Sequence, residues 1–203
     1  MKCEIIIYNK SKILPQEFYL RPTPEVARNL IGKLIFRKFK NDLLIGKIIE
    51  TEAYLAKGDP ASHSAPGPTK RNEAMFGPGG TLYIYKIYGI HLCANIVCGA
   101  EGVGTAVLIR AVEPLAGIEL MQRNRGVEDV RKLCTGPGNF AKAFALGLDM
   151  NGLRLDSEDV YILDNEEVAD GDIRTGLRIG ITKAADLPLR YWLAGNVFVS
   201  GKR

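Results

Sequence analysis

Two stretches of sequence decide the fold: LLIGKIIETEAY at residues 43–54 and TLYIYKIYGIHLCANIV at residues 81–97. Both are rich in β-branched and aromatic residues, a composition that is typical of strands. Gly89 interrupts the second stretch, so we expect two strands there, joined by a bulge or a tight turn. With a further strand expected at residues 105–112, these stretches make up the predicted active-site core, residues 46–114.

Helices and shorter strands are expected around this core. The further strands are predicted at residues 34–36, 160–163, 174–182 and 189–199, and the helices at residues 23–30, 117–123 and 138–146. The first helix has Thr23 as its expected N-cap and Pro24 at its first helical position. We therefore predict an α+β fold, a single domain over residues 1–203 in which helices flank a curved, mainly antiparallel, open-barrel-like sheet.

Two segments lack a regular pattern. Residues 1–17 read as a polar N-terminal arm. Residues 56–80 form a long loop rich in Gly, Pro, Ser and Lys. A loop of that length in a compact domain is usually either functional or disordered.

Length and composition are those of an ordinary soluble globular protein. The chain has 203 residues, of which 46% are hydrophobic and 25% charged, enough for a real core. It has no apolar run near the ~20 residues that cross a bilayer and no signal peptide, so we expect a cytoplasmic, nucleoid-associated protein without a membrane partner. The four cysteines follow neither a disulfide pattern nor a zinc-site spacing. No metal and no other cofactor is therefore predicted.

The net charge of +4 hides an uneven distribution. Residues 149–172 contain nine acids and one base, a net −8, whereas the rest of the chain has 26 bases and 14 acids, a net +12. Such an excess can form a positive face for a polyanion, with the acidic segment away from it. A solvated surface of mixed charge explains the counts equally well, so charge alone does not identify the partner.

The first stretch carries two carboxylates beside a tyrosine. Strand alternation puts Ile48, Glu50, Glu52 and Tyr54 on one face, with the carboxylates ~7 Å apart. That separation is too large for a shared proton and suits two different roles. Glu52 is placed to act as general base for a water next to a ring stacked on Tyr54. The alternative, a pair of solvated or salt-bridged edge glutamates, is disfavoured by the aromatic neighbours.

Aromatic side chains are concentrated near this carboxylate pair. His63 lies in the long loop, where it can stack on a ring or bond to it. Alternation puts Tyr83 and Tyr85 on one strand face, and we expect Tyr85 to face a pocket and Tyr83 to fill the core. Tyr88 precedes the glycine break and is placed to wedge between base pairs, whereas His91 is expected to be packed. A nucleobase is the flat, electron-poor ring that best suits such a site.

A series of short motifs follows along the chain. They are Glu50-Thr51-Glu52-Ala53-Tyr54, His63-Ser64, Thr69-x-Arg71-Asn72-x-x-Met75-Phe76, Gly80-Thr81-Leu82-Tyr83-Ile84-Tyr85-x-Ile87-Tyr88-Gly89, Asn95, Val107-Leu108-Ile109-Arg110-Ala111-x-Glu113-Pro114 and Gly136-Pro137-Gly138. In this order they resemble the 3-methyladenine (alkyladenine) DNA glycosylase family. The resemblance is densest over the predicted core and extends from about Arg21 to the C-terminus.

The resemblance implies a monofunctional enzyme of base-excision repair, active on double-stranded DNA. It implies that alkylated or deaminated purines are flipped out and hydrolysed from the sugar, which leaves an abasic site without lyase cleavage. Glu52 would activate the water that attacks the sugar C1′, and Arg110 would anchor that water and the DNA backbone. Tyr54, His63 and Tyr85 would hold the flipped base between them. We expect a monomer that needs no cofactor.

The resemblance also assigns residues at the pocket rim and on the DNA side. Asn95 would discriminate against the exocyclic amine of guanine, and Tyr88 would fill the gap left in the base stack. The expected DNA contacts are Arg71, Asn72 and Lys86.

Two other classes of protein remain open at this point. A carbohydrate glycosidase would use Glu50 and Glu52 as acid and base, and would need room for a sugar. A non-catalytic RNA- or DNA-binding module would use the aromatic residues only to stack bases. Release of a free base from alkylated DNA separates both from a DNA glycosylase.

Overall fold

Strand β2 (Asp42–Tyr54) is the central strand of the sheet. One of its edges pairs along most of its length with β5 (Thr105–Ala116). The other edge pairs first with β1 (Leu34–Phe39) and then, through Glu50–Glu52, with β8 (Arg190–Leu193). The segment that carries both carboxylates is therefore covered by a strand on each side.

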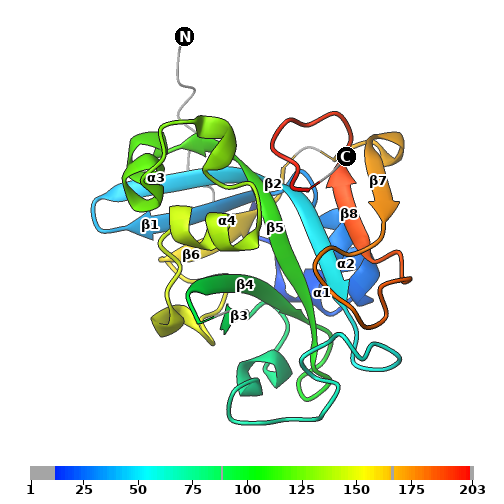
Figure 1. Ribbon diagram of the computed structural model, residues 1–203. Coiled ribbons are helices and arrows are strands. Elements are labelled where there is room, and N and C mark those ends of the chain that lie inside the picture. The colour runs from blue at the N-terminus through cyan, green and yellow to red at the C-terminus, as the bar shows by residue number, and fades with distance from the viewer. Residues whose placement is uncertain (1–11, 88, 166, 202–203) are drawn as a thin grey trace.

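The strands form one curled sheet (Figure 1). The computed structural model describes residues 12–87, 89–165 and 167–201, and every strand pair within them is antiparallel. The sheet order is β3 (Leu82–Ile87), β4 (His91–Cys98), β5, β2, β1 and β6 (Val160–Leu163), and β7 (Ile173–Gly176) is attached through β8. The predicted α+β fold with a curved antiparallel sheet is confirmed.

A β-bulge interrupts β2 where its edge partner changes from β1 to β8. The register with β5 shifts between Ile48 and Glu50. Ile48 packs in the main core together with Ala53, whereas Ile49 packs with Val199 in a separate cluster. The expected placement of Ile48 on the same face as Glu50 is therefore wrong, because the extra residue of the bulge resets the alternation.

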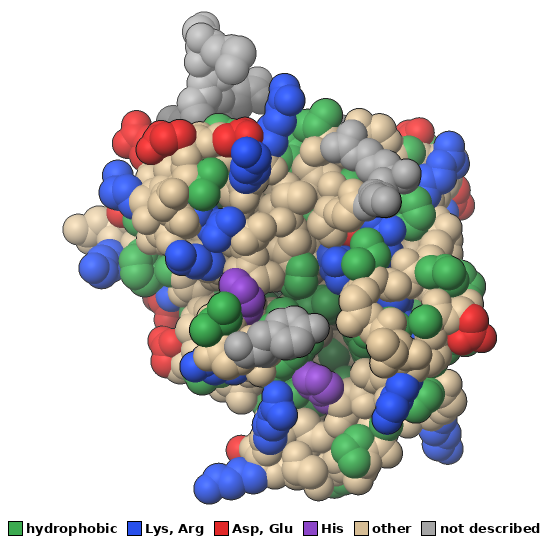
Figure 2. Space-filling view, viewed as in Figure 1, with side chains coloured by type: hydrophobic (Ala, Val, Ile, Leu, Met, Phe, Trp, Pro, Cys, Tyr) green, Lys and Arg blue, Asp and Glu red, His purple; other side chains and the backbone are tan. Residues whose placement is uncertain are grey.

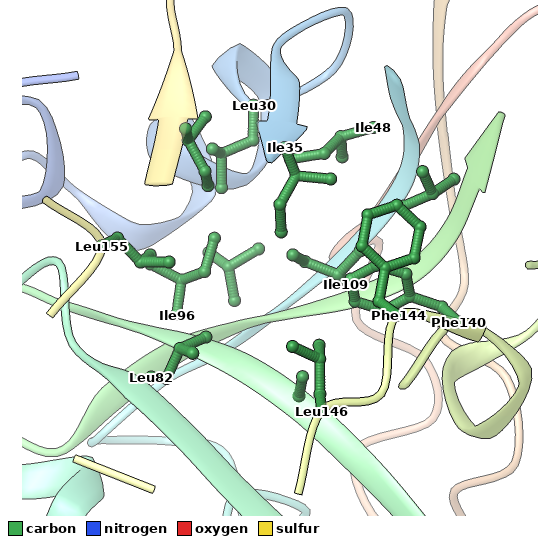
Figure 3. Close-up of a cluster of buried hydrophobic side chains, with 14 of the residues drawn as sticks. Leu30, Ile35, Ile48, Leu82, Ile96, Ile109, Phe140, Phe144, Leu146 and Leu155 are labelled. Atoms are coloured by element: carbon green, nitrogen blue, oxygen red, sulfur yellow. The ribbon is translucent and has the colours of Figure 1, made fainter. Parts of the chain in front are cut away.

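Helices cover the sheet and complete the core. Side chains of α2 (Thr23–Asn29) and α4 (Pro137–Ala143) pack in the main hydrophobic cluster. The short α1 (Gln16–Tyr19) lies beside α2, and α3 (Ile118–Arg125) lies beside α4 (Figure 1). Figure 3 shows aliphatic side chains of the strands meeting the phenyl rings near α4 in this cluster. Removing this apolar surface from water is the main source of stability.

The last two strands are shorter than the sequence predicts. Strands were expected at residues 174–182 and 189–199, but β7 ends at Gly176 and β8 ends at Leu193. The chain beyond each strand is irregular and approaches β2, where backbone groups of Ile179 and Ser200 bond to side chains. Apolar composition alone did not reveal that these segments supply hydrogen bonds rather than continue the sheet.

The helices differ from expectation at their ends. Helix α2 begins at Thr23, directly after Pro22, so Thr23 is not the N-cap. Helix α4 begins at Pro137, one residue earlier than expected. Of the expected N-terminal arm, residues 1–11 lie outside the described residues, and Leu14 is already buried in the core. No helix in the described part of the chain is long and apolar enough to cross a membrane.

Gly46→Ala is expected to destabilise the fold by about 1–3 kcal/mol, the usual cost of overpacking a core. A Cβ at this position of β2 would overlap Val112 Cγ1 and would lie 3.1 Å from Phe144 Cζ. Urea titration measures the change in the free energy of unfolding. Gly171→Ala is the control, since a Cβ there meets no atom within 4 Å. Equal losses in the two variants would contradict tight packing at Gly46.

Candidate active site

A cavity of about 420 Å³ opens on one face of the molecule, within the ~300–1,000 Å³ that is usual for small-molecule sites. Residues of the β3–β4 hairpin form one side, and the long loop and the segments 136–139 and 179–181 form the others. Figure 2 shows this hollow between the two histidines, with apolar side chains inside it and Lys and Arg side chains around it. The cavity thus combines an apolar interior with a basic surrounding.

The carboxylate of Glu52 is fully buried and is held by two hydrogen bonds and one ion pair. Tyr54 Oη donates to Oε2 over 3.0 Å, the backbone N–H of Ile179 donates to Oε1 over 2.7 Å, and Arg110 Nη1 lies 3.2 Å from Oε1 in an ion pair. All three partners belong to residues that line the cavity, so the carboxylate lies directly behind the lining. Among the described residues Oε2 accepts only the Tyr54 bond, which leaves it a lone pair for a water.

The carboxylate of Glu50 is held more completely. Its Oε1 accepts from Arg190 Nε over 2.7 Å and from Arg110 Nε over 3.2 Å, and its Oε2 accepts from the N–H of Ser200 over 2.6 Å. Glu50 has no exposed surface. Because Arg110 contacts both carboxylates, Glu50 fixes the guanidinium group that in turn contacts Glu52.

Aromatic rings form one wall of the cavity. His63 Nδ1 lies 2.9 Å from Tyr83 Oη, and the His63 ring meets the Tyr85 ring edge-on at a centroid distance of 4.3 Å. The structure brings these residues together with Tyr54 around one cavity. Tyr83, assigned to the core by the sequence, is indeed buried at 1% exposure, but it also lines the cavity and bonds to His63.

Burial keeps the rings of this wall uncharged at neutral pH. It raises the pKa of Tyr83 to about 12, and it raises the pKa values of Tyr54 and Tyr85 even more strongly. Partial burial of the ring, followed by the charge of Arg71, lowers the pKa of His63 below its ordinary value, although much of the residue is exposed. The imidazole is therefore neutral at pH ~7, with one ring nitrogen as donor and the other as acceptor.

The long loop is ordered around Asn72, which is buried. Its Nδ2 donates to the carbonyl oxygens of His63 over 2.7 Å and Gly67 over 3.0 Å, and its Oδ1 accepts from the N–H of Thr69 over 2.6 Å. Asn72, expected as a DNA contact, therefore uses its amide within the loop and fixes the backbone at His63.

The other expected site residues that the structure describes lie in the cavity or beside it. Asn95 is buried, lines the cavity and donates from Nδ2 to the carbonyl oxygen of Tyr83 over 3.1 Å. Arg71 and Lys86 are exposed, and Arg71 Nη2 donates to the carbonyl oxygen of Lys86 over 3.2 Å. This bond joins the long loop to the β3–β4 hairpin. Tyr88 lies outside the described residues.

The contribution of several residues to the site was not predicted from the sequence. His91, expected to be packed, is exposed and lines the cavity, because β4 begins with it at the turn end of the hairpin. Ile179 acts through its backbone N–H, which no side-chain pattern can indicate. Arg178 lies with its Cζ 4.6 Å from the centroid of the Tyr54 ring. The only indication of Arg178 in the sequence was an arginine between apolar residues.

Comparison with known proteins identifies the family of this chain. The chain belongs to the methylpurine-DNA glycosylase (MPG) family, whose model matches residues 17–197. It is 46% identical to a protein of Methanoculleus marisnigri over 92% of this chain and 98% of the relative. It is also 46% identical to one of Carboxydothermus hydrogenoformans over 94% and 100%, and 48% identical to one of Rhodopseudomonas palustris over 92% and 90%. Each relative is named "Putative 3-methyladenine DNA glycosylase", so the family resemblance is confirmed.

The free energy of unfolding is expected to fall as the pH drops below the ordinary histidine pKa of 6.5, and His63 supplies part of the loss. Because its folded-state pKa is lowered, the unfolded chain takes up the proton first, and stability declines until the pH passes the folded-state value. The His63→Gln variant lacks the contribution of His63. Its free energy of unfolding therefore changes less than that of wild type between about pH 7.5 and about pH 5.5. Urea titration at each pH measures the free energy of unfolding, and His91→Gln is the control for loss of an imidazole. The same pH dependence in His63→Gln as in wild type would contradict a desolvated His63.

Proposed function

We propose that the chain hydrolyses the N-glycosidic bond of alkylated purines in double-stranded DNA, with 3-methyladenine as the type substrate. The damaged nucleotide turns out of the duplex into the cavity, water displaces the base, and an abasic site remains. Deaminated purines form a second substrate class. The observation that carries this proposal is the fully buried carboxylate of Glu52, directly behind a cavity walled by aromatic rings.

The aromatic wall suits a damaged purine. Alkylation at N3 or N7 makes the purine cationic and electron-poor, and such a ring stacks well on the faces of Tyr54 and Tyr85. Turning the nucleotide out of the stack costs a few kcal/mol, and least for a damaged pair, which supplies part of the selectivity. Asn95 is held by the Tyr83 carbonyl at the cavity wall, where it would meet the edge of the purine and disfavour the exocyclic amine of guanine.

The carboxylate suits the reaction at the sugar. Loss of the base leaves positive charge on the sugar ring, and a fixed negative charge nearby stabilises it. Glu52 also has a lone pair on Oε2 for a water and accepts its proton as that water attacks C1′. Arg110 and the N–H of Ile179 hold the other oxygen, so the carboxylate needs no reorganisation during the reaction.

Water, rather than an amine of the protein, is the proposed nucleophile. The lining residues in the described part of the chain include no lysine. A Schiff base with the sugar, which strand cleavage by a glycosylase with lyase activity requires, would need such an amine. We therefore propose a monofunctional enzyme that leaves the DNA strand unbroken.

The two alternative classes fit the geometry less well. A carbohydrate glycosidase needs a second carboxyl group free to exchange a proton, but Glu50 is enclosed by two guanidinium groups and a backbone amide. A binding module that only stacks bases has no use for a fully buried Glu52 carboxylate, because burying a charge is costly.

The surface around the cavity suits a DNA backbone. Arg71 and Lys86 are exposed beside it, and Ile90, 75% exposed near the tip of the β3–β4 hairpin, is an apolar side chain of the kind that enters the minor groove. Acidic residues of the segment 149–172 line a different hollow, beside α1 and α2. These acidic residues are Asp164, Glu167 and Asp170, and none of them lines the cavity.

Glu52→Gln is expected to lower the rate of base release by about 10²–10⁴-fold, the usual contribution of a general base. Glutamine has nearly the same shape, and its oxygen can still accept from the N–H of Ile179. Affinity for the damaged duplex should therefore stay within a few-fold of wild type. Single-turnover release of 3-methyladenine and fluorescence anisotropy with the same duplex measure the two effects.

The matched control is Glu101→Gln, which changes an exposed glutamate in the loop before β5 and should leave both quantities at wild-type values. Near wild-type release by Glu52→Gln would remove Glu52 from the mechanism. A loss of binding that matches the loss of release would show that Glu52 supports the cavity instead of the reaction.

A further inference from the structure

A second ion pair lies behind the aromatic wall, and the mechanism described above does not use it. The side chains of Asp59 and Arg178 are both fully buried. They meet through two hydrogen bonds, from Arg178 Nη1 over 2.6 Å and from Nη2 over 2.7 Å. Asp59 also accepts from the backbone N–H groups of Leu55 and Ala61, at the start of the long loop.

This pair places a positive charge behind Tyr54. Arg178 Cζ lies 4.6 Å from the centroid of the Tyr54 ring. Tyr54 lines the cavity and Arg178 does not, so the ring separates the guanidinium group from whatever occupies the cavity. A base stacked on the open face of Tyr54 would lie roughly 8–10 Å from that guanidinium group, given ring separations of about 4.5 Å.

The buried charges around the site cancel. In the described part of the chain the buried carboxylates are those of Glu50, Glu52 and Asp59. Three buried guanidinium groups contact them, those of Arg110, Arg178 and Arg190. Removing the charge of Asp59 alone would leave these six groups with one unbalanced positive charge, next to the Tyr54 ring on which the base would stack.

We propose that Asp59 is a specificity residue that acts through Tyr54: by neutralising Arg178 it lets a cationic purine stack on the ring. The pair then sets how strongly the cavity prefers cationic over neutral damaged bases. This inference rests on the proposed function, because it takes Tyr54 as the platform of the flipped base. It adds a role for two buried residues that do not touch the substrate.

Both partners keep their charge at neutral pH. Burial disfavours the charge of Asp59, but the Arg178 hydrogen bonds and the two backbone N–H groups outweigh it and lower the pKa of the carboxyl group. Burial likewise opposes the charge of Arg178, and its bonds to Asp59 raise its pKa in spite of this. The cavity therefore faces a neutral pair under ordinary conditions.

The test compares two duplexes that differ in the charge of one base. One holds 7-methylguanine, which is cationic, and the other holds 7-methyl-7-deazaguanine, its neutral isostere; a 2′-fluoro sugar blocks cleavage in both. Fluorescence anisotropy gives the affinity for each duplex. The affinity for 7-methylguanine divided by the affinity for 7-methyl-7-deazaguanine reports the preference for the cation. An unmodified duplex measured alongside shows whether the wild type recognises either base.

Asp59→Asn is expected to lower this ratio about tenfold, because a unit charge ~9 Å away acts through an effective dielectric of ~20–30. Arg178→Gln breaks the same ion pair but leaves the carboxylate of Asp59, which still accepts from the backbone N–H groups of Leu55 and Ala61, so the ratio should rise. A pair that merely holds the loop would shift both affinities equally in both variants.

The outcomes separate this inference from the proposed function. Opposite shifts of the ratio in Asp59→Asn and Arg178→Gln support it, and an unchanged ratio in both overturns it. If Asp59→Asn does not fold, as judged by circular dichroism, Arg178→Gln decides alone: a raised ratio supports the inference and an equal or lower ratio overturns it. Wild type that binds neither modified duplex better than the unmodified one would instead count against the proposed function.

Discussion

The site depends on one buried guanidinium group, that of Arg110, which lies between two buried carboxylates. Its Nε contacts Glu50 and its Nη1 contacts Glu52. Removing one partner of a buried ion pair costs about 3–5 kcal/mol, so Arg110 stabilises the burial of both carboxylates. Strand β5 supplies Arg110 and strand β2 supplies both glutamates. The pairing of these two strands is thus the structural condition for a charged carboxylate beside the cavity.

The bulge in β2 explains how the fold meets this condition. It lies where β1 gives way to β8 as the edge partner, and it resets the alternation so that Ile48 packs in the core while Glu50 meets Arg190 of β8. Strand types and the curved antiparallel sheet could be predicted from sequence, because β-branched and aromatic residues mark strands directly. The bulge could not, since no glycine or proline marks it, and it depends on which strands meet β2 on each side.

The site, like the fold, could be predicted from sequence only in part. Glu52, Tyr54, His63 and Tyr85 were predicted because carboxylate and aromatic side chains can be recognised in the sequence. The structure brings the three rings to one cavity, with Glu52 bonded to Tyr54 behind its lining. The contributions of the C-terminal segments were not found, because they are made by backbone groups such as the N–H of Ile179. Their position follows from long-range folding of chain that has no regular pattern.

We propose that the buried carboxylate and the aromatic cavity together release a damaged purine by attack of water. The most direct measurement is chromatography of the products after wild-type protein is incubated with alkylated duplex DNA. We expect free 3-methyladenine together with an unbroken strand that holds an abasic site. DNA that is bound without any released base, or a broken strand with protein covalently attached to its sugar, would contradict it.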